Sequence, residues 1–376
     1  MCKRLKPKGF FMRQLRQTMG MLLIIAFFVC CVQTDPQAAQ ATPTEAVSQS
    51  PAPTEPPIPT ETPSPTPEPT AEQVFIETPA PTEVPTAIPT ETPLPSVEPA
   101  PTPFSIVWMS DTQNLTRHYP EVFNSMRDWI LNEQEAQNIV FMIHSGDVVD
   151  ACTNAMWDNA SIALIPVLYK IPGMIVSGNH DLGTKDPYAM FFNRPYAKMV
   201  QPEGQKYRDG ESAYQTFTAG GDEFLVFGLG YGVRGPAEID WIESVIEQHP
   251  DAVILFVMHY GLQPENRYSG QARELYENIV KKTPNAKLLL CGHYQGALRH
   301  EDVIDDDEDG NPDRTFYTLM FNVQDDAEQG LGFMRIMTFY PEDRRIEFRT
   351  YSPWLDKWEY PNVLPEDNTF TLENAY

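Results

Sequence analysis

Short apolar runs alternate with helical patterns along most of residues 104–376. Runs of this length between polar or turn-forming residues predict strands buried within a sheet. They are Phe104–Met109, Ile139–Ile143, Met174–Val176, Ala252–Met258 and Lys287–Leu290. Between them, apolar residues spaced three or four apart predict amphipathic helices. These comprise the segment with Val122, Phe123, Met126 and Ile130, then Met156–Tyr169, a helix that begins at Pro236, and Ala272–Val280.

Other strands are predicted with no helix between them. Tyr214–Thr218 and Glu223–Phe227 are joined through two glycines, which indicates a hairpin. After residue 293 the predicted strands follow one another: Thr315–Val323, Phe333–Tyr340 and Arg345–Tyr351. Buried strands that alternate with helices, followed by hairpins, predict an α/β fold of layered sheets with helices outside.

Residues that bind metal ions stand directly after five of these strands. They are Asp111 in Ser-Asp-Thr-Gln, Asp147 in Gly-Asp-Val-Val-Asp, Asn179 in Gly-Asn-His-Asp, His259, and His293 in Gly-His-Tyr-Gln. The loops at the carboxyl ends of strands converge on one edge of an α/β sheet, where ligands bind. We therefore expect these residues to meet in space. Taken singly each has a plain structural explanation, such as a helix cap, a turn or a core histidine.

The set and order of these motifs resemble the calcineurin-like metallophosphoesterase family. The family pattern is Asp-x-His, Gly-Asp-x-x-Asp, Gly-Asn-His-Asp, an isolated His and Gly-His-x-His, and the likeness covers Ile106 to about Gln295. An Asp-x-Gln first motif and the tail Arg349–Pro353 resemble a bacterial, exported branch. The resemblance implies a four-layer α/β/β/α sandwich for residues 104–376.

The resemblance also implies two divalent metal ions that activate a water for attack on a phosphate ester. Asp147 is the implied bridging ligand, and Asp111 binds the first metal. Asn179, His259 and His293 complete the second metal. His180 is the implied catalytic acid for the leaving group. Asp181 is counted with His180 in the catalytic set. Either Asp181 or Asp150 would orient a histidine.

Two glutamines depart from the family pattern. Gln113 and Gln295 stand where many members have histidine, and both positions belong to the first metal. Amide oxygen is a harder and weaker ligand than imidazole, so this site should favour Mn²⁺, Mg²⁺ or Ca²⁺ over Zn²⁺ and bind weakly. Mn, Mg, Fe, Zn and Ca all stay open for the pair. The glutamines also leave two alternatives, which are a single-metal phosphodiesterase and a metal-binding or surface-recognition module without turnover.

The charge balance limits the partners. The formal net charge of −25 argues against nucleic acid and anionic membrane surfaces. Any phosphate must be attracted by local positive charge, which bound metals supply. We expect a phosphate-ester small molecule or headgroup as the substrate. Monoester and diester both remain open.

Residues 1–41 are predicted to be a signal peptide or a membrane anchor. A basic start precedes the apolar run Met19–Val32, which is shorter than the roughly 20 residues of a membrane span. Ala39–Ala41 offers a cleavage site, and Cys30 and Cys31 offer lipidation. Each alternative places the rest of the chain outside the cytoplasm, secreted or tethered to the outer face of the membrane.

Residues 42–103 are predicted to be a disordered stalk. They hold more than half of the chain's 36 prolines, with many Thr and Glu residues. Such a composition buries too little apolar surface to fold and favours extended segments.

An acidic run at residues 305–313 partly fits a calcium-binding loop. Asp305, Asp307, Asp309, Gly310 and Asp313 match positions 1, 3, 5, 6 and 9. Phe316 occupies the twelfth position, where the loop requires Glu. A solvated loop between two strands is therefore the favoured interpretation, with calcium binding left open.

Overall fold

The computed structural model describes residues 101–182, 206–207, 211–232, 235–324 and 331–376. The chain divides into two units, Met1–Thr90 and Glu91–Tyr376, and the described residues all belong to the second. The predicted leader at residues 1–41 and all but the last three residues of the predicted stalk lie outside the described part. Among the residues described, no helix has the length and apolar character needed to cross a membrane.

The first sheet joins the beginning and the end of the folded chain. Its strand order is β15-β14-β13-β1-β2-β3, and β16 pairs with β14. Strands β1, β2 and β3 are parallel, whereas the C-terminal strands pair antiparallel. The bounds are β1 Phe104–Met109, β2 Ile139–His144, β3 Gly173–Ile175, β13 Met334–Tyr340, β14 Arg345–Ser352, β15 Lys357–Trp358 and β16 Thr369–Leu372.

The second sheet has the order β11-β12-β10-β7-β6-β5-β4. Its central strands β12, β10, β7 and β6 are parallel. The bounds are β4 Lys206–Tyr207, β5 Ser212–Ala219, β6 Asp222–Leu229, β7 Val253–Met258, β10 Ala286–Cys291, β11 Gly296–Ile304 and β12 Arg314–Asn322. A small separate hairpin is formed by β8 Leu262–Gln263 and β9 Arg267–Tyr268.

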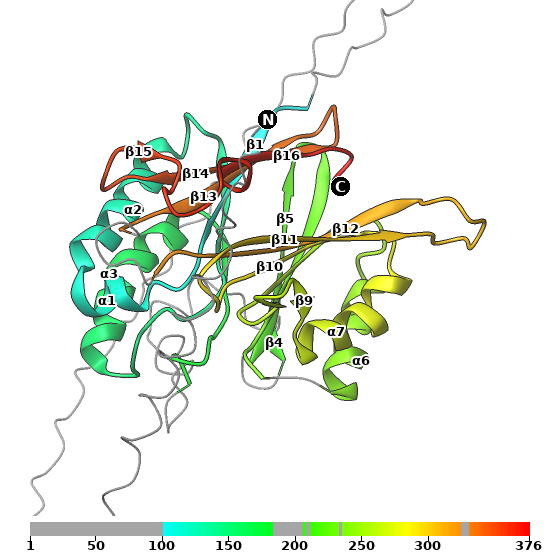
Figure 1. Cartoon of the computed structure of the whole chain (residues 1–376), viewed down its shortest axis with the longest axis horizontal. Helices are drawn as coiled ribbons and strands as arrows, with labels where there is room; N and C mark the ends of the chain where they lie inside the picture. Colours follow the sequence, from blue (N-terminus) through cyan, green and yellow to red (C-terminus); the bar gives the residue numbers. More distant parts are fainter. Residues whose placement is uncertain (1–100, 183–205, 208–210, 233–234, 325–330) are drawn as a thin grey trace, which may run out of the picture. The chain divides into compact units, whose positions relative to one another are not determined.

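Helices cover the outer face of each sheet (Figure 1). On the first sheet lie α1 Gln113–His118, α2 Pro120–Glu133 and α3 Asn154–Lys170. On the second lie α6 Pro236–Ile246, α7 Gly270–Asn278 and the 3₁₀ helix η2 Val280–Lys282. The short helix α8, Pro365–Asn368, precedes β16. The order of layers is α/β/β/α, as the sequence predicted.

The strands are apolar throughout because both of their faces are covered. In β1, Ile106 and Trp108 point into the core between the two sheets. The alternate residues Val107 and Met109 pack against Phe123 and the other buried residues of α2 and α3. A third core fills the space between the second sheet and its helices. Removing both faces from water in this way contributes about 1.5–3 kcal/mol for each large side chain.

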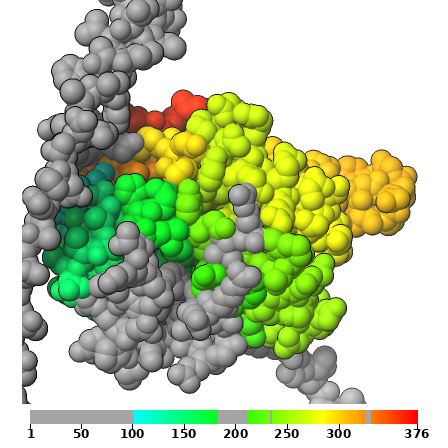
Figure 2. Space-filling view, turned by 90° about the horizontal axis from the view of Figure 1, so that it is seen from below, coloured from blue at the N-terminus to red at the C-terminus, as the bar shows by residue number. Residues whose placement is uncertain are grey.

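The predicted strands and helices are all present, with ends that shift by a few residues. The helix from Pro236 buries Ile242 and Val245, while Ile239 and Ile246 are only partly buried. Strand β11 was not predicted, because Ile304 is its single buried residue and no apolar alternation marks it. It forms a long hairpin with β12 that projects from the body of the fold, with the acidic run at its tip (Figures 1 and 2).

Candidate metal and phosphoester site

The site is assembled from the carboxyl ends of strands in both sheets. Asp111 follows β1 and Asp147 follows β2, while His259 follows β7 and His293 follows β10. Backbone hydrogen bonds connect these loops within each sheet: Asp111 N–H donates to Gly146 O at 3.0 Å, and Gly292 N–H donates to His259 O at 2.9 Å. The predicted meeting of residues far apart in sequence is therefore observed.

Three of the predicted ligands have a strained backbone. Asp111, Asp147 and His293 have φ values of 53°, 52° and 76°. Such conformations cost on the order of 1–3 kcal/mol for a residue other than glycine and cluster at functional sites. Close packing explains the motif glycines as well. A Cβ on Gly178 would collide with the Asp147 carboxylate, and one on Gly292 with that of Asp111.

The second predicted metal site has a compact set of donors. Ligand atoms of Asp147, His259 and His293 all lie within 4.8 Å of one another. His259 Nε2 is 3.0 Å from Asp147 Oδ2 and 3.1 Å from His293 Nδ1. Its Nδ1 lies 3.0 Å from Ser145 O, and donation to that carbonyl turns Nε2 toward Asp147 and His293 as the possible ligand atom. These donors fit a divalent cation.

Asn179 adds an independent sign that this group of donors suits a cation. Its Oδ1 is buried and has no hydrogen-bond partner. An unpaired buried carbonyl costs about 1–3 kcal/mol, so such atoms need an explanation. The predicted role of Asn179 as an oxygen ligand supplies one.

The protonation equilibria show how much negative charge is concentrated here. Burial raises the pKa of Asp111 to about 7, with nearby Asp147 adding to the shift and His259 opposing it. Burial alone would lower the pKa of His259, but Asp111 and Asp147 outweigh it and raise that pKa to about 9. Burial, with His259 nearby, lowers the pKa of His293 to about 4. A divalent cation would neutralise the same carboxylates that attract this proton.

Gln113 is placed to serve the first predicted metal site. Its side chain is 3% exposed. In the amide orientation that satisfies its neighbours, Nε2 donates to the backbone carbonyls of Asp111 at 3.0 Å and Asp147 at 2.9 Å. Oε1 then occupies the position 3.4 Å from Asp147 Oδ2. An amide oxygen beside the carboxylate that was predicted to bridge two metals fits an oxygen-rich cation site.

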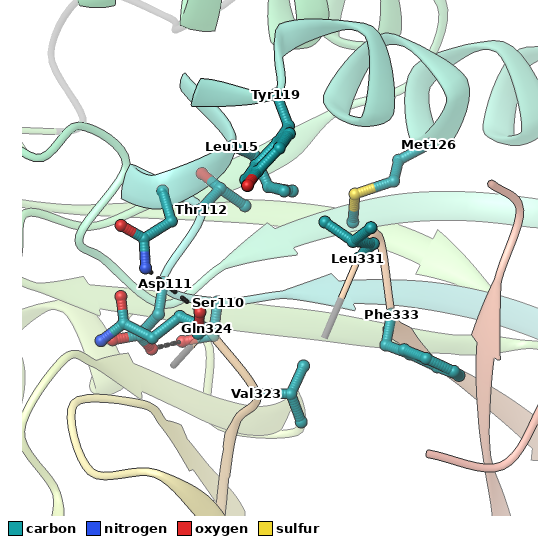
Figure 3. Close-up of a pocket in the computed structure, with 11 residues that line it drawn as sticks. Ser110, Asp111, Thr112, Leu115, Tyr119, Met126, Val323, Gln324, Leu331 and Phe333 are labelled. Carbon is teal, nitrogen blue, oxygen red and sulfur yellow. Dashed lines mark hydrogen bonds between the residues drawn. The ribbon is translucent and has the colours of Figure 1, made fainter. Parts of the chain in front are cut away.

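Two other glutamines bear on the first predicted metal site: Gln295, which the sequence predicted as a ligand, and Gln324, which it did not. Gln295 has an exposed side chain, and its assignment as a ligand stays a prediction. The amide that contacts Gln113 belongs to Gln324, which lies beside Ser110 and Asp111 in a pocket (Figure 3). Sequence reasoning missed Gln324 because it belongs to no motif. The feature that points to Gln324 is its position after β12, which pairs in parallel with β10, the strand that precedes His293.

The predicted acid, His180, is held by Asp150. The His180 ring Nδ1 is 3.0 Å from Asp150 O and 3.4 Å from Asp150 Oδ1, and the ring is exposed. Arg117 in turn pairs with Asp150 Oδ2. Of the two carboxylates considered for orienting a histidine, Asp150 is the one that lies beside the His180 ring, at Nδ1. The predicted acid role of His180 would therefore use Nε2.

Asp181 has a different position from the one predicted for it. Its buried carboxylate accepts hydrogen bonds from the N–H groups of Gly178 at 2.8 Å, Val149 at 3.0 Å and Val148 at 3.2 Å. Burial raises its pKa to about 6. Asp181 therefore connects the loop of Asp147 to the loop of Asn179, and its described contacts are with backbone rather than with a histidine.

A family comparison identifies the chain. The sequence model described as calcineurin-like phosphoesterase matches residues 104–295, which contain every motif of the site. The chain belongs to this family.

Relatives of this chain include a larger bacterial protein. Over 264 residues it is 31% identical to the uncharacterized protein YvnB of Bacillus subtilis, covering 68% of this chain but 20% of that protein. The chain thus spans about a fifth of the length of this relative. Among solved structures, GAP50 of Plasmodium is 12% identical (72% of this chain, 89% of that chain, TM-score 0.45). The Yfce phosphoesterase of Escherichia coli is 9% identical (68% and 96%, TM-score 0.30).

Proposed function

We propose that this phosphoesterase is exported and uses two divalent metal ions to hydrolyse a phosphomonoester or phosphodiester. The position of Asp147 carries the proposal. Its Oδ2 is 3.0 Å from His259 Nε2 and 3.4 Å from the Gln113 amide, so donors of both predicted metal sites meet at one carboxylate oxygen. A carboxylate between two donor sets suits a bridging ligand.

The chain's own residues would divide the work of the reaction. Asp147, Asn179, His259 and His293 would hold one ion, and Asp111, Gln113 and Asp147 the other. The ions, when bound, supply positive charge for the phosphate and lower the pKa of the attacking water. His180 Nε2 would give a proton to the leaving-group oxygen, while Asp150 fixes the orientation of the ring.

The surroundings and the substrate class follow from the sequence. The signal or anchor at residues 1–41 and the Pro/Thr-rich residues 42–103 support a protein outside the cytoplasm, secreted or tethered to the membrane. A net charge of −25 supports a small phosphate ester or a headgroup rather than nucleic acid as substrate.

The test compares hydrolysis of a chromogenic phosphomonoester and diester by the full chain with added Mn²⁺, Mg²⁺, Ca²⁺ or Zn²⁺. We expect Mn²⁺ to restore turnover after dialysis against a chelator. His180→Ala should lower kcat by about 10²-fold while metal content stays unchanged, because it removes a proton donor and no ligand. The loss should be smaller for a nitrophenyl leaving group, which needs little protonation, than for an alcohol leaving group, which needs a proton to depart. Tight metal binding with no turnover of either ester would favour a binding module instead.

A further inference from the structure

We propose that Gln324 supplies an oxygen ligand to the first metal site, as the partner of Gln113. The inference rests on the proposed two-metal function and names a residue that no motif of the family includes. Three features of the structure support this role. The backbone of Gln324 is anchored on both sides, its side chain contacts Gln113, and the resulting donor set has a consistent chemistry.

Asn322 fixes the segment that ends at Gln324 to the loop of His293. Asn322 is 1% exposed and stands at the end of β12. Its Nδ2 donates to His293 O at 3.1 Å, and its Oδ1 accepts the Gln324 N–H at 2.9 Å. One buried amide thus connects the backbone of a predicted ligand of the second metal to that of Gln324.

The other side of Gln324 is fixed to the helix that carries Gln113. Asn114 Nδ2, in the first turn of α1, donates to Gln324 O at 3.1 Å. The backbone of Gln324 is therefore held from both sheets, on one side by the segment after β1 and on the other by the loop after β10. Such support is what keeps a ligand in position.

The side chains of the two glutamines meet directly. With Gln113 oriented as above, its Nε2 lies 2.8 Å from Gln324 Oε1, and its Oε1 accepts from Gln324 Nε2 at 3.0 Å. The Gln324 amide is therefore held against the Gln113 amide, which itself lies on the backbone carbonyls of Asp111 and Asp147.

The donor set has a consistent chemistry. Gln324 lies beside Asp111 in the pocket (Figure 3) and contacts Gln113, whose amide is 3.4 Å from Asp147 Oδ2. The proposed set is therefore two carboxylates, Asp111 and Asp147, with the amide oxygens of Gln113 and Gln324. Oxygen-only sites suit Mn²⁺, Mg²⁺ and Ca²⁺. If the glutamine pair served only to connect α1 to β12, its loss would alter stability without changing the number of bound ions.

The test is Mn²⁺ binding by the full chain, followed by metal analysis and by the exchange-coupled electron paramagnetic resonance signal of a Mn²⁺ pair. An ion bound singly elsewhere, such as at the acidic loop, does not produce that coupling. We expect the wild type to show the coupled signal. Gln324→Leu should lose it and keep one ion at the site, and Gln324→Glu should retain it because a carboxylate oxygen replaces the amide oxygen. Gln248→Leu, which changes an exposed glutamine on the surface beside α6, is the matched control.

The possible outcomes distinguish the ligand role of Gln324 from a structural role, and both from failure of the two-metal proposal. A coupled pair in the wild type that persists in Gln324→Leu would overturn this inference and leave the two-metal function standing. Loss of the pair in Gln295→Leu but not in Gln324→Leu would return the role to Gln295. Loss of the pair and of all bound Mn²⁺ in both Gln324 variants would mean a structural role. A wild type without a coupled pair would overturn the two-metal proposal itself.

Discussion

Two groups of possible metal-binding side chains in the described part of this protein are compact, but their surroundings differ. One is the group of Asp147 with His259 and His293, and the other is Asp305, Asp307 and Asp313 at the tip of the β11–β12 hairpin. In each, the donors lie within 4.8 Å of one another. The first group is mostly buried, and the second is mostly exposed.

The hydrogen bonds explain the difference. In the hairpin tip the carboxylates accept from the loop's own backbone, for example Asp305 from Gly310 N–H at 2.8 Å and Asp313 from Asp306 N–H at 2.7 Å. These backbone N–H groups partner the exposed carboxylates, as expected for a solvated loop. In the buried group the donor atoms face one another, and Asn179 Oδ1 has no partner. The buried group is therefore the stronger candidate for a metal site, because a buried acceptor without a partner, Asn179 Oδ1, adds to the closeness of its donors.

The largest effect should come from Asp147→Asn. Asparagine tolerates the positive φ of this position and keeps an oxygen for the His180 N–H, but it removes the charge shared by both predicted sites. We expect kcat to fall roughly 10³-fold, as for other losses of charge stabilisation in an active site. The gain in melting temperature on adding Mn²⁺ should also disappear, because bound ions stabilise only the state that binds them.

The control for this substitution is Asp150→Asn, which changes a carboxylate next to His180 but no predicted ligand. It should keep the Mn²⁺-dependent gain in melting temperature. If Asp147→Asn keeps that gain as well, the bridging assignment is wrong.

Asp181→Ala should have an intermediate effect, on stability first. Three buried N–H groups lose their acceptor, at a cost of about 3 kcal/mol or more in the free energy of unfolding. The loops of Asp147 and Asn179 would lose their connection, so turnover should fall too. Denaturant unfolding measures the first effect. Asp181→Asn keeps one oxygen acceptor and should lose less, whereas equal losses would point to charge rather than hydrogen bonding.

The sequence predicted most of the site because its signals are local. Apolar runs located the strands, and the short motifs within four residues of the end of each run located Asp111, Asp147, Asn179, His259 and His293. Gln324 was missed because its position depends on the pairing of β12 with β10, which no short motif records. The sequence could not decide whether Asp150 or Asp181 lies beside a histidine. That depends on which groups the loops turn toward each carboxylate, and only the folded chain determines it.

The smallest effect should come from the hairpin tip. Asp305→Asn combined with Asp307→Asn removes two charges but keeps oxygen acceptors for Asp309 and Gly310 N–H. Exposed substitutions of this kind change the free energy of unfolding by less than about 0.5 kcal/mol. Hydrolysis and its Mn²⁺ requirement should stay at the wild-type level. A melting temperature that rises with Ca²⁺ in the wild type but not in this variant would contradict the interpretation of the tip as a solvated loop. It would show that exposed carboxylates are stabilised by a bound ion even when the backbone of their own loop already donates hydrogen bonds to them.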